Sequence, residues 1–186
     1  MREERTVGIL RKDGPQLAIL FVCAVGMFAL TKLVAARVEA IDSRVAGFWY
    51  QDGLRKSHAG AGAGSIESFR KSVAIESDNP TYVLAFTDAL AAGGHQDEAK
   101  QELLRLLAAN PADPQVNLHL ARLAAAAGQV QDAVHYYHSA LDGLPAGEAG
   151  VEQRRDVRQE LIYFLIGRHD ESRARAELLT QDGDTQ

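Results

Sequence analysis

Residues of the same kind recur in this sequence at intervals of 34 positions. Gly60, Gly94 and Gly128 keep this interval, and so do Pro80 and Pro114. A fixed period of a few tens of residues is typical of a solenoid, in which each unit buries its apolar face against its neighbours. The repeat therefore predicts an array of similar units with a groove along it. An ordinary helical bundle with accidental periodicity is the alternative.

Each unit has the pattern of two helices joined by a short turn. In the unit at 80–113, Val83, Phe86 and Leu90 follow the i, i+3, i+7 spacing of one helix face. A glycine pair then ends the first helix, and the second helix ends before Pro111, because the residue before a proline is pushed out of the helical region. The unit at 114–147 repeats this arrangement.

These features resemble the tetratricopeptide repeat (TPR) family, whose unit is a 34-residue helix–turn–helix. The resemblance implies an all-α fold, an α-solenoid of about three to four TPR-like hairpins. The apolar segment described below adds an N-terminal transmembrane helix before the solenoid. The predicted parts are a tail at 1–13, a transmembrane helix at 14–36, a juxtamembrane stalk at 37–46, a divergent first repeat at 47–79, repeats at 80–113 and 114–147, a final hairpin at 148–180 and a tail at 181–186.

The two outer repeats depart from the family pattern. In the first, Asp52 and Lys56 stand where large apolar residues are usual, and a glycine-rich turn at 58–64 predicts a short or frayed first helix. In the last, Gly167 corresponds to Gly128 at an offset of 39 residues, and the extra residues are expected in a flexible connector at 146–151.

The segment from Gly14 to Thr31 contains no charged residue, and four apolar residues follow Lys32. Such a stretch is long enough to span the hydrocarbon core of a bilayer. A cleaved signal peptide is an alternative, but the candidate cleavage site at 38–40 has a glutamate at its centre. A lipoprotein is a second alternative, but it would need a small residue before Cys23, where a valine stands. We expect an uncleaved anchor of the bacterial inner membrane. A slight excess of basic residues before the segment favours the membrane orientation in which the repeats lie on the periplasmic side.

Composition and motifs argue against several functions. The chain has 25 Asp and Glu against 20 Lys and Arg, which disfavours a nucleic-acid partner. Cys23, the one cysteine, excludes a cysteine-based metal site. His135 and His138 have metal-ligand spacing without a third ligand nearby, so we predict that they are surface residues. No catalytic motif is visible, and we expect no enzyme activity, cofactor or metal.

The resemblance also implies that the first helix of each hairpin lines a concave groove for a partner protein. The expected groove residues are Leu84, Asp88, Leu118, His119, Arg122, Ala125, Arg154, Arg158, Leu161 and Phe164. Four of them form a basic cluster, although these cations could instead be solvated or paired with Glu148, Glu152, Asp156 or Glu160.

Two functions fit this arrangement. The first is a membrane-anchored scaffold whose groove binds a segment of another protein, in the assembly or stabilisation of a membrane or envelope complex. The alternative is a structural accessory subunit of a larger membrane complex, without recognition by the groove. In both, residues 14–36 contact the lipid bilayer.

We predict that the chain stays in the membrane pellet after carbonate or high-salt washing, because the apolar segment is held by lipid and not by charge. Immunoblotting of the pellet and sequencing of the mature N-terminus check this. A mature N-terminus at Ile41, or release by salt alone, would contradict the prediction.

Overall fold

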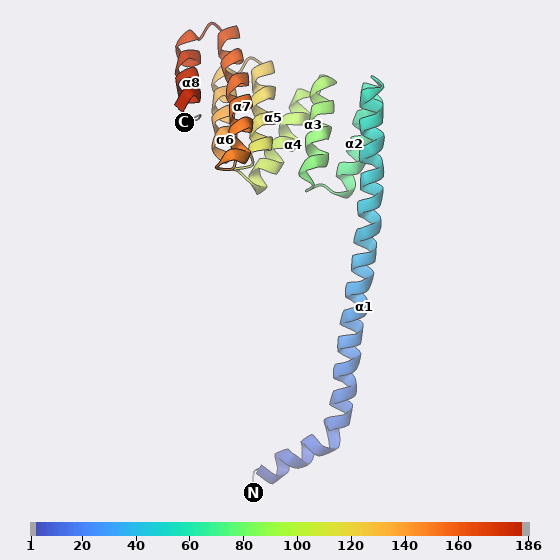
Figure 1. Cartoon of the computed structure of the whole chain (residues 1–186). Helices are drawn as coiled ribbons and strands as arrows, with labels where there is room; N and C mark the ends of the chain where they lie inside the picture. Colours follow the sequence, from blue (N-terminus) through green and yellow to red (C-terminus); the bar gives the residue numbers. More distant parts are fainter. Residues whose placement is uncertain (1–2, 184–186) are drawn as a thin grey trace. The chain divides into compact units, whose positions relative to one another are not determined.

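The computed structural model describes the backbone of residues 3–183 and the side chains of residues 20–35, 37–147 and 150–180. This described part is helical, and Figure 1 shows its helices joined by short connections. The helices are α1 (Glu3–His58), α2 (Gly62–Ile75), α3 (Pro80–Ala92), α4 (Gln96–Ala109), α5 (Pro114–Ala126), α6 (Val130–Gly143), α7 (Glu148–Gly167) and α8 (Glu171–Gly183).

The chain divides into two units at the Val45–Ala46 boundary, which lies within α1. In the second unit, the end of α1 and α2 form a first hairpin, and α3–α4, α5–α6 and α7–α8 form three more. Successive hairpins pack through α2 and α3, α4 and α5, and α6 and α7 (Figure 1). The predicted all-α solenoid of helical hairpins is confirmed.

A left-handed residue closes the turn of each of the first three hairpins. Gly60, Gly94 and Gly128 have φ angles of +74°, +84° and +75°, a region that glycine adopts at little cost. The residue after each glycine donates its backbone N–H to a carbonyl five positions earlier, as His95 does to Leu90 at 2.8 Å. This bond satisfies a carbonyl at the helix end. The 34-residue glycine spacing is therefore the spacing of these turns.

The turn of the last hairpin is displaced from the position that the sequence predicts. His169, not Gly167, has the positive φ, of 61°, and Asp170 donates to the carbonyl of Leu165 at 3.0 Å. Because His169 is the structural equivalent of Gly128, the offset is 41 residues and not 39. Ala174 is accordingly the buried alanine of α8, as Ala133 is of α6.

Three further boundaries differ from the sequence prediction. Helix α7 begins at Glu148, so most of the segment predicted as a connector at 146–151 is helical. The predicted tails at 1–13 and 181–186 contain helical backbone from Glu3 and up to Gly183, and their remaining residues lie outside the described part.

The first hairpin is regular, and the prediction of a short or frayed helix is wrong. Helix α1 is unbroken to His58, and Gly53 lies so close to α2 that an added Cβ would meet the Phe69 ring at 2.6 Å. Asp52 is buried and accepts hydrogen bonds from Lys56 and Ser68, both at 2.6 Å, and from Arg55. Hydrogen bonds from Lys56, Ser68 and Arg55 hold the pKa of Asp52 well below its usual range. A polar network thus occupies a position that is usually apolar.

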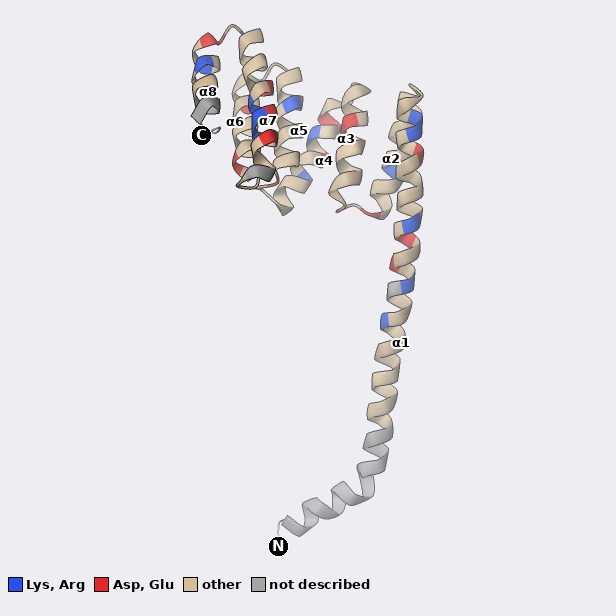
Figure 2. Cartoon of the chain, in the orientation of Figure 1, with Lys and Arg blue, Asp and Glu red and all other residues tan. Residues whose placement is uncertain are grey.

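Within the described part, α1 contains the one segment that is long and apolar enough to cross a membrane, judged by length and composition alone. Its side chains are exposed, among them Leu20, Phe21 and Phe28. Among the described side chains, the first charged residue is Lys32. Figure 2 shows a stretch of α1 without charged residues, followed by a stretch that carries both signs of charge.

We predict that Ala133→Leu lowers the free energy of unfolding of the repeat unit, residues 46–186, by about 1–3 kcal/mol, because a larger side chain overpacks a filled core. Ala133 is fully buried in the cluster that contains Tyr137 and Ala174. Urea unfolding followed by circular dichroism measures the change. Ala108→Leu, at an exposed position of α4, is the control. Equal stability of the two variants would show that Ala133 does not set the helix spacing.

Candidate functional site

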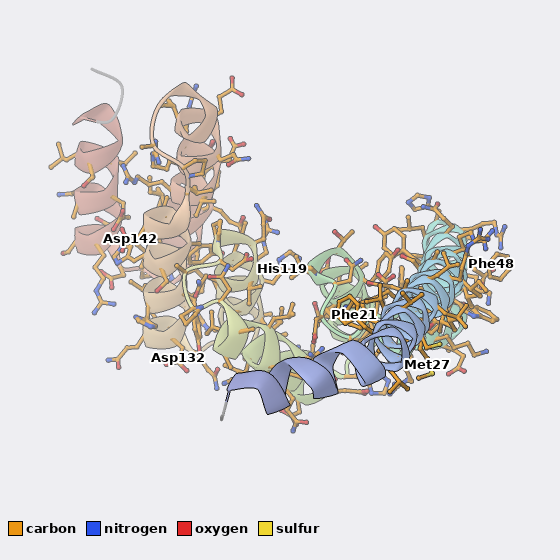
Figure 3. All side chains as sticks on the ribbon, turned by 90° about the horizontal axis from the view of Figure 1, so that it is seen from below. Phe21, Met27, Phe48, His119, Asp132 and Asp142 are labelled. Atoms are coloured by element: carbon orange, nitrogen blue, oxygen red, sulfur yellow. The ribbon has the colours of Figure 1, made fainter. Side chains whose placement is uncertain are left out.

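Polar side chains from the first helices of three hairpins form a row along one side of the array. Asp88 lies on α3, His119 and Arg122 on α5, and Glu160 on α7. Figure 3 labels His119 among the side chains of these helices. Successive hairpins bring these residues together: Asp88 pairs with His119, and Arg122 with Glu160. Each pair joins positions that are three residues, about one helical turn, away from equivalence in the repeat. We call these four residues the polar row.

His119 bridges its own helix and α3. Its Nδ1 lies 2.9 Å from the Gln115 carbonyl oxygen, and its Nε2 lies 3.2 Å from Asp88 Oδ1. Both neighbours are acceptors, so both ring nitrogens are best placed as donors, which requires the imidazolium form. Burial opposes this charge, but the hydrogen bond and the attraction of Asp88 raise the pKa of His119 above its ordinary value of 6.5.

Arg122 and Glu160 form a bidentate pair between α5 and α7. Arg122 donates from Nε and Nη2 to the two carboxylate oxygens, each at 2.9 Å, and the Tyr137 hydroxyl donates to Oε1 of Glu160 at 2.8 Å. Parallel bonds of this kind fix orientation as well as adding energy. Burial opposes ionisation, yet the bonds from Arg122 and Tyr137 lower the pKa of Glu160. Burial and the bond to Glu160 raise the pKa of Tyr137.

Open hollows lie on both sides of Arg122. The hollow between α3, α4 and α5 has a volume of about 140 Å³, and that between α5, α6 and α7 about 180 Å³. Small and apolar side chains supply much of their lining, and members of the polar row contribute to both hollows. The lining includes Ala91, Leu103, Leu123 and Ala126 in the first hollow, and Leu118, Ala140, Leu144 and Val157 in the second.

Most expected groove residues of α3 and α5 lie on this side of the array. Asp88, His119 and Arg122 belong to the polar row, and Leu118 lines the second hollow but is largely buried. Leu84 and Ala125 are half-buried beside the core. The structure therefore brings the expected residues of α5 together with Asp88.

The expected groove residues of α7 lie elsewhere, because the predicted offset between the last two hairpins is 39 residues and the offset in the structure is 41. Leu161 is fully buried, and Phe164 packs with its ring centroid 6.3 Å from that of Tyr137. Arg158 is buried, with its Nε 3.7 Å from a carboxylate oxygen of Glu177 on α8. Arg154 donates to the Pro145 carbonyl at 2.8 Å. The expected basic cluster of four residues is thus divided among separate contacts, and Arg122 has the partner Glu160 that the sequence offered as an alternative.

The 41-residue offset identifies groove positions on α7 that the sequence analysis missed. Glu160 is equivalent to His119, and Tyr163 and Ile166 to Arg122 and Ala125. Tyr163 and Ile166 are 64% and 51% exposed and lie about one helical turn apart on α7. A glycine marks the other turns but not this one, so the sequence contains no clear signal for the true register.

The second helices carry the histidine pair. His135 is exposed, and His138 Nε2 lies 2.8 Å from Oε1 of Glu177 on α8. Among the described residues, no group of three or more His, Cys, Asp and Glu side chains is arranged to hold a metal ion.

Solved structures share this fold. The crystal structure of MamA protein aligns with 76% of this chain and 73% of its own, with a TM-score of 0.59 and 13% identity. MamA 41-end from Desulfovibrio magneticus RS-1 aligns with 75% of both chains, with a TM-score of 0.59 and 16% identity. The first TPR of Spaghetti (RPAP3), bound to the HSP90 peptide SRMEEVD, covers 64% of this chain and 94% of its own, with a TM-score of 0.51 and 17% identity.

No protein-family model matches the sequence, and no curated protein matches it. The likeness is therefore one of fold: the described part of the chain after residue 45 has the fold of a TPR-type α-solenoid, with four helical hairpins.

We predict that Asp88→Asn lowers the pKa of His119, because the imidazolium loses its anionic partner. His119 has a raised pKa when folded, so its contribution to stability is full below about pH 6.5 and is lost as the pH rises through the folded value. An NMR titration of the His119 ring protons measures the shift. Asp132→Asn, at an exposed carboxylate of α6, is the control (Figure 3). An equal His119 pKa in both variants would refute the contact.

Proposed function

We propose that this protein is a membrane-anchored scaffold that binds a segment of a partner protein on the side of the array that carries the polar row. The observation that carries the proposal is the pair of hollows beside Arg122, together with the exposed Tyr163 and Ile166 on α7. Recognition sites combine apolar area with a few placed polar groups, and aromatic residues are enriched among binding hot spots.

The polar row defines what a partner segment must supply. Arg122 and His119 are already paired with Glu160 and Asp88, so a carboxylate of the partner gains only by exchange with these residues. Apolar side chains can enter the hollows without this exchange. We therefore propose a segment with an apolar anchor and an acidic group beside it. The acidic peptide on the first TPR of Spaghetti is consistent with this choice of ligand class.

The apolar segment of α1 supports a site of action at a membrane. Its exposed side chains match the chemistry of lipid tails, and residues 14–36 are the proposed anchor. A scaffold placed there would assemble or stabilise a membrane or envelope complex, on the periplasmic side of a bacterial inner membrane.

The alternative is a structural accessory subunit that binds its complex through the second helices. The pairing of the groove cations favours this function, because a paired arginine has less to offer a ligand. In that case the partner would contact the side that carries His135.

A photo-reactive amino acid at position 163 should give partner adducts in cells, because Tyr163 is exposed and its register position on α7 is equivalent to that of Arg122 on α5. The matched control is the same amino acid at position 135, which is exposed on a second helix. Immunoblotting and mass spectrometry of the tagged chain identify the adducts. Adducts from position 135 alone would overturn groove binding and support the accessory subunit.

A further inference from the structure

The first unit carries an exposed apolar stripe with the spacing of a coiled coil. Alternating steps of three and four residues connect Leu20, Ala24, Met27, Thr31, Val34, Val38, Ile41 and Val45. In heptad notation, Leu20, Met27, Val34 and Ile41 are d positions, and Ala24, Thr31, Val38 and Val45 are a positions. A repeat of this kind keeps one face of a helix against a partner helix.

The part of the stripe after residue 36 best distinguishes a protein partner from lipid, because α1 is no longer uniformly apolar there. Val38 and Ile41 are each 51% exposed and Val45 is 41% exposed. The charged residues Arg37, Glu39, Asp42 and Arg44 lie outside the a and d positions. Apolar residues that face lipid need no such order, so this separation of apolar and charged positions indicates a protein partner.

We propose that this partner is a second copy of the chain, and that two α1 helices form a parallel coiled coil through the stripe. Arg37 is a g position and Asp42 is the following e position. In a parallel pair, the g residue of one helix faces the following e residue of the other. Arg37 therefore faces Asp42 of the second copy, and the symmetry of the pair forms this contact twice.

The same charges disfavour the antiparallel arrangement. Antiparallel helices bring g positions opposite g positions, where Arg37 and Arg44 of one copy would meet the same two arginines of the other. Like charges across an interface select against the wrong pairing. The orientation therefore follows from charge alone, and it agrees with two chains inserted in a membrane in the same direction.

The apolar part of the stripe is compatible with close helix packing. Its a positions, Ala24 and Thr31, are small, and small residues allow helix backbones to approach in a bilayer. Thr31 donates its hydroxyl to the Met27 carbonyl at 2.8 Å, so its polar group is satisfied within its own helix. Met27 and Phe21 both extend from α1 (Figure 3), but only Met27 belongs to the stripe.

Disulfide cross-linking of the full chain in native membranes tests the interface. In a Cys23→Ser background, Val38→Cys and Ile41→Cys should form disulfide-linked dimers on oxidation with copper phenanthroline. Ala40→Cys and Ser43→Cys, at c and f positions, are the matched controls and should form several-fold less. Equal yields at the four positions, or the highest yield at Ser43→Cys, would overturn the proposal.

Charge reversal tests the parallel pairing. Arg37→Asp and Asp42→Arg should each reduce the Ile41→Cys cross-link several-fold, because like charges then face each other twice. Mixing the two variants under different tags should restore it, since both contacts of the mixed pair join opposite charges. Failure of the mixed pair to exceed either variant alone would overturn the parallel register. The photo-adduct at position 163 is a separate readout, so loss of self-association and loss of groove binding are distinguishable.

Discussion

The left-handed turn that closes each hairpin determines the geometry of the repeat unit. A residue with φ near +75° redirects the chain after the first helix, and the N–H of the next residue bonds back to that helix. The second helix then begins at a fixed distance from the turn, so its buried positions are fixed as well. Ser65, Ala99, Ala133 and Ala174 each follow their turn residue by five positions, and all are buried. Small residues at this point let the helices of a hairpin approach closely.

The regular turns also explain why the polar row exists. The second helices carry the large core residues Phe69, Leu103 and Tyr137, and the first helices present their other face to solvent. The solvent-exposed faces of successive first helices therefore lie side by side, and Asp88 pairs with His119, and Arg122 with Glu160, across hairpins. These pairs connect α3 to α5 and α5 to α7. The same contacts that define the candidate site thus also hold neighbouring repeats together.

The sequence was sufficient to predict the repeat class, the hairpins at 80–147 and the buried side chains of their helices, because glycine and proline mark each helix boundary there. It was insufficient where a residue other than glycine adopts the left-handed conformation. His169 replaces glycine at the last turn, and the nearby Gly167 shifted the expected register by two residues. Two positions turn a helix by more than half a revolution, so Arg158 and Leu161 were expected in a groove when they face the interior. Asp52 was identified as unusual, but its Ser68 partner is distant in sequence and required the structure.

Pairing within the polar row changes how the binding of an acidic partner segment would depend on salt concentration. A free arginine would attract anions at long range, and salt would weaken this attraction. Arg122 is instead held by Glu160, and His119 by Asp88, so the row carries opposite charges in adjacent pairs. A carboxylate ligand must displace an internal carboxylate of similar strength, and the net gain then comes from apolar contact with the hollows and with Tyr163 and Ile166. On this argument the shape and apolar content of a segment govern its affinity, and its charge governs orientation.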